Sequence, residues 1–222
     1  MKIILVLCVF LTAMPAFAGT FKDNFDDGDL DGWTTFGKDW KVENGKLTCS
    51  WSGINEGAIL TIGNSSWIDY TFEYDGIVLE KLSDNYYLGH VMRYDKQSAF
   101  FLYTAFHAPP WNNPVIGFIV NDQNFFIQGR QFGPELNKWY HLKMVMQGKE
   151  AKFYIDDNLE VTYQHDLIPE SGSVGILFGG CMAEFDNVII TGSNVPDGGS
   201  IGFAIASKRK LTTTWGEIRR GK

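Results

Sequence analysis

Apolar and polar residues alternate along most of the chain between residues 20 and 192. In residues 67–79, for example, Tyr70, Phe72 and Tyr74 share one face of an extended strand, and polar residues separate them. This two-residue period predicts half-buried β-strands, and no stretch has a convincing helical period. A strand signal at Phe21 and Phe25 precedes further predicted strands at 40–43, 46–49, 58–61, 67–79, 86–94, 99–106, 115–120, 125–128, 139–146, 151–155, 159–163, 174–178 and 183–190.

The connections between these strands carry residues typical of tight turns. Asn44-Gly45 separates the runs 40–43 and 46–49, and this dipeptide is a strong hairpin signal because both central positions of a type I′ turn need a positive φ. Many short strands at regular spacing predict an all-β fold with antiparallel sheets, either a sandwich or a barrel.

The N-terminus has the pattern of a secretory signal peptide. Lys2 precedes a mostly apolar run over residues 3–14, and Ala16-Phe17-Ala18 is a small-x-small cleavage site. We therefore expect residues 1–18 to be removed and the protein to be secreted, into the extracellular space or a periplasm. No later stretch is long and apolar enough to cross a bilayer.

Charge is distributed unevenly along the chain. Residues 201–222 contain six Lys or Arg and one Glu, whereas residues 19–200 contain 12 basic and 25 acidic residues. The acidic body argues against nucleic acid as a partner and suits neutral sugars, cations or basic partners. Residues 194–200 have the composition of a linker, and the basic C-terminal tail is a flexible extension, a sorting signal or a docking peptide.

An ordered set of short motifs resembles the concanavalin A-like, laminin-G-like jelly rolls of bacteria. The resemblance covers about residues 20–192 and predicts that residues 19–193 form one antiparallel β-sandwich of the jelly-roll type. Its motifs are Phe25-Asp26-Asp27, Leu30-Asp31-Gly32-Trp33, residues 40–47 (WKVENGKL), Met92-Arg93-Tyr94, residues 99–103 (AFFLY), residues 138–143 (KWYHLK), residues 153–157 (FYIDD), residues 172–176 (GSVGI) and residues 185–188 (FDNV).

This fold carries lectins, carbohydrate-binding modules, glycosidases and adhesion modules, so it does not by itself define an activity. Together with the predicted signal peptide, we interpret the chain as a secreted, non-catalytic, lectin-like module that binds carbohydrate or another extracellular glycan. A weaker similarity to 3-keto-disaccharide hydrolase-type domains implies a glycan-processing hydrolase as the alternative, and a structural adhesion module is a third. The sequence leaves the oligomeric state open.

No catalytic residue can be assigned from the sequence. Glu73 and Asp75 share a strand face, whereas Glu80 is an odd number of positions from Glu73 and points to the other face. Glycoside hydrolysis needs two carboxyl groups at a defined separation, and this spacing gives no such pair. We interpret these residues as a solvated strand face.

A candidate cation loop lies near the start of the mature chain. Asp27, Asp29 and Asp31 alternate before Gly32, as at the start of an EF-hand loop, but the twelfth position is Lys38. The resemblance adds Asp186 as a fourth ligand, because many jelly rolls of this type hold one structural Ca²⁺ where the first and last strands meet. The alternatives are a structural Ca²⁺ site and a solvated acidic turn.

Two cysteines, Cys49 and Cys181, remain after removal of the signal peptide. An exported protein with an even number of cysteines permits one disulfide, which would join the first hairpin to the last strand. Two buried free thiols are the alternative.

Sugar binding needs flat aromatic rings and planar polar side chains. Trp111 is the best candidate, because it stands between Pro110 and Asn112 in a loop rather than in a core strand. Arg93 is a charged residue inside a strand, and it is either a buried paired charge or a ligand clamp. The predicted ligand-binding residues are Tyr87, Arg93, Tyr103, His107, Trp111 and Asn112.

Overall fold

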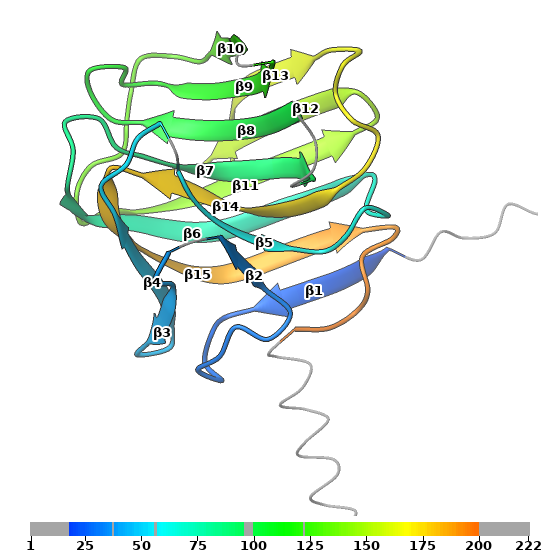
Figure 1. The fold of residues 1–222 in the computed structure, drawn as a ribbon, viewed down its shortest axis with the longest axis horizontal. Coiled ribbons are helices and arrows are strands. Elements are labelled where there is room, and N and C mark those ends of the chain that lie inside the picture. Colours follow the sequence, from blue (N-terminus) through cyan, green and yellow to red (C-terminus); the bar gives the residue numbers. More distant parts are fainter. Residues whose placement is uncertain (1–17, 37, 56, 96–99, 122, 200–222) are drawn as a thin grey trace, which may run out of the picture.

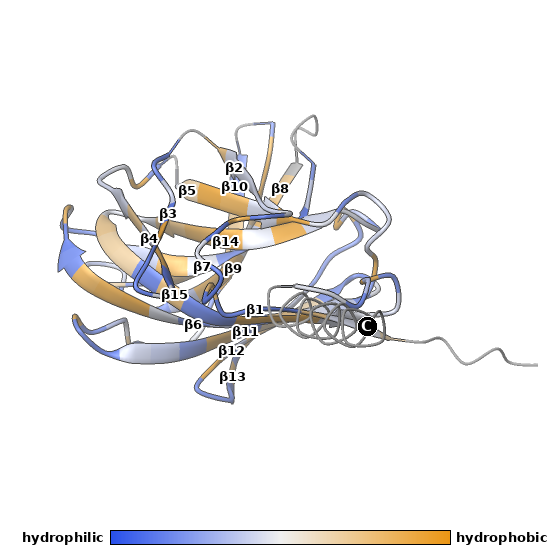
Figure 2. Cartoon of the chain, turned by 90° about the horizontal axis from the view of Figure 1, so that it is seen from below, coloured by the Kyte–Doolittle hydropathy of each residue, from blue (hydrophilic) through white to orange (hydrophobic). Residues whose placement is uncertain are grey.

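The computed structural model describes residues 18–36, 38–55, 57–95, 100–121 and 123–199. Two antiparallel sheets pack face to face in a jelly-roll sandwich, as predicted (Figure 1), and the two layers are seen edge-on in Figure 2. The predicted basic tail and all of the predicted signal peptide except Ala18 lie outside the described residues. No helix long and apolar enough to span a bilayer occurs in the described part of the chain.

The first sheet contains eight strands in the order β13-β12-β11-β6-β15-β4-β3, and β1 pairs with β15 beside this path. Its strands are β1 (Gly19–Asp23), β3 (Lys41–Glu43), β4 (Lys46–Trp51), β6 (Tyr70–Lys81), β11 (Trp139–Gln147), β12 (Glu150–Ile155), β13 (Asn158–Gln164) and β15 (Cys181–Gly192).

The second sheet contains seven strands in the order β10-β9-β8-β7-β14-β5-β2. Its strands are β2 (Thr34–Phe36), β5 (Ala58–Ile62), β7 (Tyr87–Tyr94), β8 (Phe100–His107), β9 (Pro114–Val120), β10 (Gln123–Gln128) and β14 (Ser173–Gly179).

The predicted Asn44-Gly45 hairpin is confirmed. Glu43 pairs with Lys46 across the turn, and φ is +55° at Asn44 and +70° at Gly45. The short strand β2 was not predicted, because its three residues are exposed or only half-buried and show no buried alternation. It forms the edge of the seven-stranded sheet next to β5.

The core between the sheets is rich in aromatic side chains. Tyr74, Phe178 and Phe185 are fully buried, and the rings of Phe178 and Phe185 are 5.5 Å apart. His90 is also part of this core. Its Nδ1 lies 2.7 Å from Oγ1 of Thr104, and burial lowers the pKa of the imidazole to about 3, so His90 is a neutral structural residue.

Cys49 and Cys181 are both buried and both free, so the predicted disulfide is absent. The reason lies in the register of β4 and β15, where Cys49 is opposite Ala183 and Cys181 is opposite Trp51. The cysteines are therefore diagonal neighbours, for which Cα atoms are about 7–8 Å apart, beyond the usual disulfide range. Burial raises the pKa of both thiols, to about 11 and about 12.

Residues 194–199 differ from the predicted linker. Val195 is buried in the core, and the backbone amide of Lys22 donates to the carbonyl of Gly198 at 3.0 Å. Oδ1 of Asp197 accepts a hydrogen bond from the amide of Thr20 at 2.8 Å. The segment therefore runs along β1 as part of the sandwich, although its composition is that of a turn.

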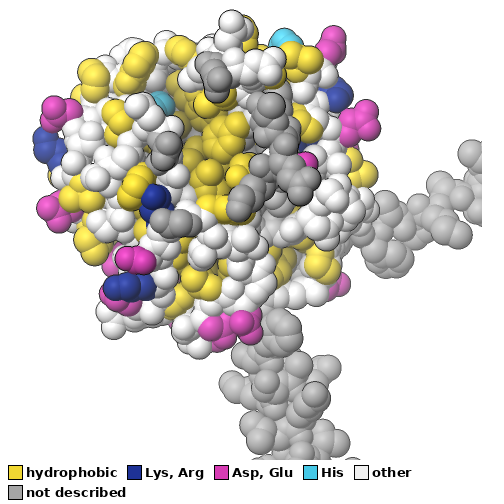
Figure 3. All heavy atoms as spheres, in the orientation of Figure 1, with side chains coloured by type: hydrophobic (Ala, Val, Ile, Leu, Met, Phe, Trp, Pro, Cys, Tyr) yellow, Lys and Arg dark blue, Asp and Glu magenta, His cyan; other side chains and the backbone are white. Residues whose placement is uncertain are grey.

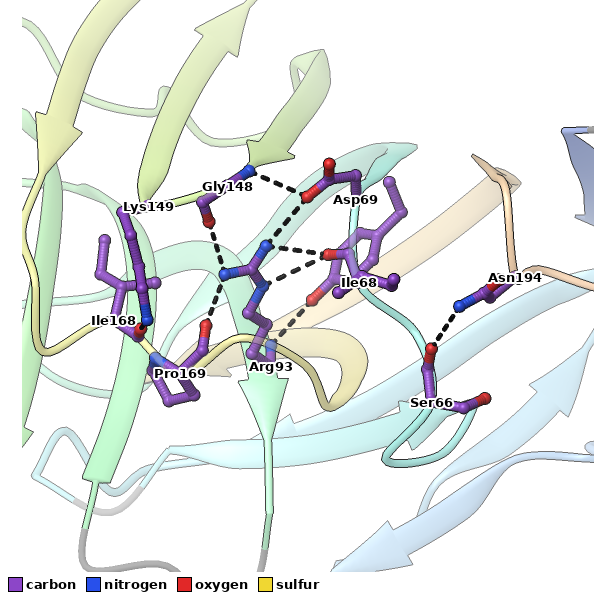
Figure 4. Close-up of polar contacts among 10 residues, drawn as sticks. Ser66, Ile68, Asp69, Arg93, Gly148, Lys149, Ile168, Pro169 and Asn194 are labelled. Atoms are coloured by element: carbon purple, nitrogen blue, oxygen red, sulfur yellow. Dashed lines mark hydrogen bonds and ion pairs between the residues drawn. The ribbon is translucent and has the colours of Figure 1, made fainter. Parts of the chain in front are cut away.

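Arg93 joins three loops at one end of the sandwich (Figure 4). Its guanidinium donates to the carbonyl oxygens of Ile68, Gly148 and Pro169, with Nη1 2.6 Å from Gly148 O and Nη2 3.0 Å from Ile68 O. Nη2 also lies 3.2 Å from Oδ1 of Asp69. The side chain is 1% exposed, so Arg93 is a buried structural clamp.

We expect Arg93→Ala to lower the free energy of unfolding by about 3 kcal/mol or more, because several buried carbonyl groups lose their donor together. Chemical denaturation measures this change. Lys138→Ala is the control, since Lys138 forms an ion pair with Glu135 at 2.9 Å in which both side chains are exposed and such pairs contribute little. Equal losses in the two variants would contradict the clamp.

Candidate functional site

A cleft of about 710 Å³ opens on the outer face of the seven-stranded sheet, the face turned away from the eight-stranded sheet. Figure 3 shows hydrophobic side chains gathered in a hollow on this side of the molecule. The described residues that line it are Ile54, Asn55, Gly57, Ile59, Asn85, Tyr87, Phe101, Tyr103, Ala105, His107, Trp111, Asn113, Val115, Ile119, Asn124, Phe126, Gln128 and Leu177.

Alternation along β8 explains how one strand serves both the core and the cleft. Leu102 and Phe106 are buried in the core, whereas Tyr103, Ala105 and His107 face the cleft. The neighbouring strand β7 adds Tyr87, whose ring lies 5.0 Å from that of His107. The cleft side of the sheet therefore carries a second cluster of buried apolar residues, separate from the core.

The loop between β8 and β9 presents Trp111 at the rim of the cleft. The amide of Asn112 donates to the carbonyl of Ala108 at 3.0 Å, and the amide of His107 donates to the carbonyl of Asn113 at 3.0 Å. The loop is thus fixed at both ends, and Trp111 between them is 51% exposed. Its ring lies 6.4 Å from the ring of Phe126 on β10 in an edge-to-face arrangement.

Amide side chains supply the polar groups of the cleft. Oδ1 of Asn124 accepts a hydrogen bond from the hydroxyl of Tyr103 at 2.9 Å, and Oδ1 of Asn85 lies 3.3 Å from Nδ1 of His107. Asn113 is only 2% exposed, and its Oδ1 has no hydrogen-bond partner among the described residues. A buried acceptor without a donor is costly, and this oxygen has almost no accessible surface.

His107 is uncharged at neutral pH. Burial lowers the pKa of its imidazole to about 4. Burial also raises the pKa of the Tyr87 and Tyr103 hydroxyls, so all three side chains are neutral across the physiological range. The three side chains therefore give the cleft aromatic and hydrogen-bonding groups without charge.

Four of the six predicted ligand residues line the cleft: Tyr87, Tyr103, His107 and Trp111. Arg93 does not, because a positive φ of 47° and a register shift on the neighbouring β14 turn it out of the alternation that Tyr87 follows. Asn112 is displaced as well: φ there is +51°, and the next residue, Asn113, faces the cleft instead.

Sequence reasoning missed the contribution of β10 to the cleft. Asn124, Phe126 and Gln128 alternate along β10 and line the cleft together. Residues 123–128 (QNFFIQ) show no alternation of apolar and polar residues, and the face of each side chain depends on pairing with β9, where Asn124 is opposite Ile119. The β9–β10 register is therefore needed to identify these three residues as part of the cleft.

No Asp or Glu lines the cleft among the residues that the structure describes. Glu73 and Asp75 lie instead on the outer face of the eight-stranded sheet, where Nδ1 of His141 is 2.8 Å from Oδ1 of Asp75 and Nε2 is 3.7 Å from Oε2 of Glu73. Asp75 also accepts from Nδ2 of Asn187 at 2.8 Å. Glu80 is exposed farther along β6.

The structure does not bring the predicted calcium ligands together. Asp27, Asp29 and Asp31 are exposed, and Oδ2 of Asp186 lies 3.3 Å from Nζ of Lys46. Within the described residues, no group of three or more His, Cys, Asp or Glu side chains is arranged to hold a metal ion. A structural Ca²⁺ therefore stays a prediction without an assembled site.

Asp23 is the residue that holds the acidic loop together. This buried carboxylate accepts from the amide of Phe25 at 2.9 Å and from Nε1 of Trp33 at 2.8 Å. Oδ1 of Asp29 accepts from the amide of Asp31 at 2.8 Å, as in an Asx turn. Local hydrogen bonds thus fold the loop, and its remaining carboxylates face water.

No protein-family model matches the chain, and no curated protein is significantly similar to it in sequence. Solved structures do share its architecture. The carbohydrate-binding module CBM66 from Bacillus subtilis is 23% identical, with a TM-score of 0.59 over 72% of this chain and 95% of that chain.

Two further solved structures extend the comparison. A β-glucanase from Bacillus licheniformis is 9% identical, with a TM-score of 0.58 over 78% of this chain and 97% of that chain. The carbohydrate recognition domain of Emp47p is 14% identical, with a TM-score of 0.51 over 77% of this chain and 93% of that chain. The protein therefore has the concanavalin A-like sandwich fold that its motifs predicted.

Proposed function

We propose that this protein is a secreted, non-catalytic module that binds carbohydrate in the cleft of its seven-stranded sheet. The observation that carries the proposal is the chemistry of that cleft: aromatic rings and amides are among the side chains that line it, and none of its described residues is acidic. Aromatic faces stack on the apolar face of a sugar ring, and amides bind its hydroxyl groups. The three similar structures, two of them sugar-binding domains and one a glucanase, support carbohydrate as the class of ligand.

Trp111 is the primary stacking residue in this proposal. It is the most exposed aromatic side chain of the cleft, and Phe126 supports it from the side. The amide side chain of Asn113, two positions along the chain, also lines the cleft and hydrogen-bonds a hydroxyl group of the same sugar. Stacking and a directional hydrogen bond together select a sugar over a purely apolar ligand.

A glycan-processing hydrolase remains the alternative, and product release distinguishes it. Hydrolysis of a glycosidic bond uses paired carboxyl groups. Glu73 and Asp75 are on the other sheet, where Asp75 contacts the side chains of His141 and Asn187. A polysaccharide screen that records both retention and product release tests both functions. Retention without new reducing ends supports the binding module, and release of products would establish the hydrolase. An adhesion module would neither retain nor cleave the polysaccharides.

We expect Trp111→Ala to weaken binding to a retained polysaccharide at least tenfold, because stacking on an exposed ring contributes about 1.5 kcal/mol or more. Affinity electrophoresis or calorimetry measures the change. The matched control is Trp139→Ala, since Trp139 is 40% exposed but lies on the eight-stranded sheet. Retention that survives Trp111→Ala unchanged would reject the proposed site.

Binding is expected to be independent of pH between 8 and 5. The pKa of His107 is about 4, so the imidazole stays neutral over this range, whereas an ordinary histidine gains its charge near pH 6.5. Calorimetric titration at several pH values measures the profile. A change of more than about twofold centred near pH 6.5 would contradict a neutral His107.

Folding must be monitored in the same experiment. The folded-state pKa of His107 is below its unfolded value, so the unfolded chain binds the proton first and stability falls as pH drops from about 6.5 toward 4. Circular dichroism at each pH shows whether the protein remains folded at the temperature of the titration. Only affinities from folded samples enter the comparison.

A further inference from the structure

The floor of the cleft is aliphatic, and the proposed function does not account for this. Ile59, Leu177, Ala105 and Val115 lie at its base, and the last three are at most 4% exposed. Flat aromatic rings suit a sugar, but branched aliphatic side chains offer it no such surface. A sugar pressed onto this floor would bury hydroxyl groups without partners, which costs free energy.

Strand pairing arranges these residues as a trough that crosses the sheet. Ile59 on β5 is opposite Leu177 on β14, and Leu177 is opposite Gly89 on β7. Farther along, Ala105 on β8 is opposite Val115 on β9. Five adjacent strands contribute, so the trough is roughly 19 Å long at a strand spacing of about 4.8 Å.

The middle of the trough is low because its residues are small. Gly89 has no side chain, and a Cβ there would lie 2.0 Å from the carbonyl oxygen of Thr104 on β8. The larger side chains of Ile59 and Val115 stand toward the two ends. All four aliphatic side chains border the same cleft.

Polar groups occupy the margin of the cleft instead of its floor. Asn85, His107 and Asn113 lie on one side, near Trp111, and Asn124 and Gln128 lie on the edge strand β10. The cleft is thus divided into an aromatic, hydrogen-bonding margin and an apolar floor. A ligand that satisfies both parts has a polar head and an apolar chain.

We propose that the cleft binds an amphipathic glycoside, with the sugar at Trp111 and Asn113 and an alkyl or acyl chain along the floor from Val115 to Ile59. This inference rests on the proposed sugar binding and specifies the class of its ligand. The chain would displace water from the cleft, and the hydroxyl groups of the sugar would hydrogen-bond to the amide side chains of its margin.

Calorimetry with methyl, butyl, hexyl and octyl β-glucosides and β-galactosides, each below its critical micelle concentration, tests the inference. Affinity is expected to rise with chain length by up to about fourfold for each methylene buried. Equal affinity for the methyl and octyl members would overturn it. If in that case Trp111→Ala weakens binding of the glycosides or of a polysaccharide, the proposed sugar binding stands, and only the role of the alkyl chain is rejected.

Ala105→Leu fills the middle of the floor and is expected to weaken octyl glycoside binding at least about tenfold, and to weaken methyl glycoside binding less. Val115→Thr is a second variant of nearly the same shape that places a hydroxyl group on the floor. It should have the same direction of effect if Ala105→Leu does not fold. If octyl glycoside binding is unchanged in every one of these two variants that folds, the inference is overturned.

Octanol separates the chain from the sugar. Octanol that binds as tightly as the octyl glycosides would overturn the inference and count against the proposed function, because the sugar would add nothing. Failure of every glycoside and polysaccharide to bind would overturn both. Retention of the protein on vesicles that contain a glycolipid is then compared with calorimetric binding of free octyl glycoside. The comparison identifies whether the ligand is the headgroup of a membrane lipid or a free glycoside.

Discussion

The seven-stranded sheet is apolar on both faces, and the eight-stranded sheet covers only one of them. On β8, Leu102 and Phe106 face the core while Phe101, Tyr103 and Ala105 face the other way. Sandwich strands normally alternate apolar and polar positions, because one face meets water. The departure from that rule locates the cleft, and the loop around Trp111 and the edge strand β10 enclose it.

Arg93 and Asp23 show two ways in which charged groups serve the fold instead of a ligand. Each is almost completely buried, and each is surrounded by hydrogen-bond partners from its own chain: three loop carbonyls for Arg93, and a backbone amide and an indole for Asp23. A buried charge is tolerated only with such partners. Both residues therefore stabilise loops at the ends of strands. Neither lines the cleft, where no Asp, Glu, Lys or Arg is found among the described residues.

The sequence predicted the architecture well because alternation and turn residues are local signals. The strands, the hairpin at Asn44-Gly45 and the residues Tyr87 and Trp111 of the cleft follow from such signals. The position of Arg93 does not, since a single residue with a positive φ changes the face on which a strand places its side chains. The free thiol of Cys49 likewise depends on strand register, which no local pattern encodes.

The pairing of residues 194–199 with β1 affects how this domain can be linked to other polypeptide segments. Gly198 is hydrogen-bonded to Lys22, and Val195 packs beside Gly19, so the first and last described segments lie within the length of one short strand. A domain with adjacent ends tolerates insertion into a loop of a host protein, and also circular permutation. The sandwich is thus suited to fusion at either end, or at both, with little strain on its own fold.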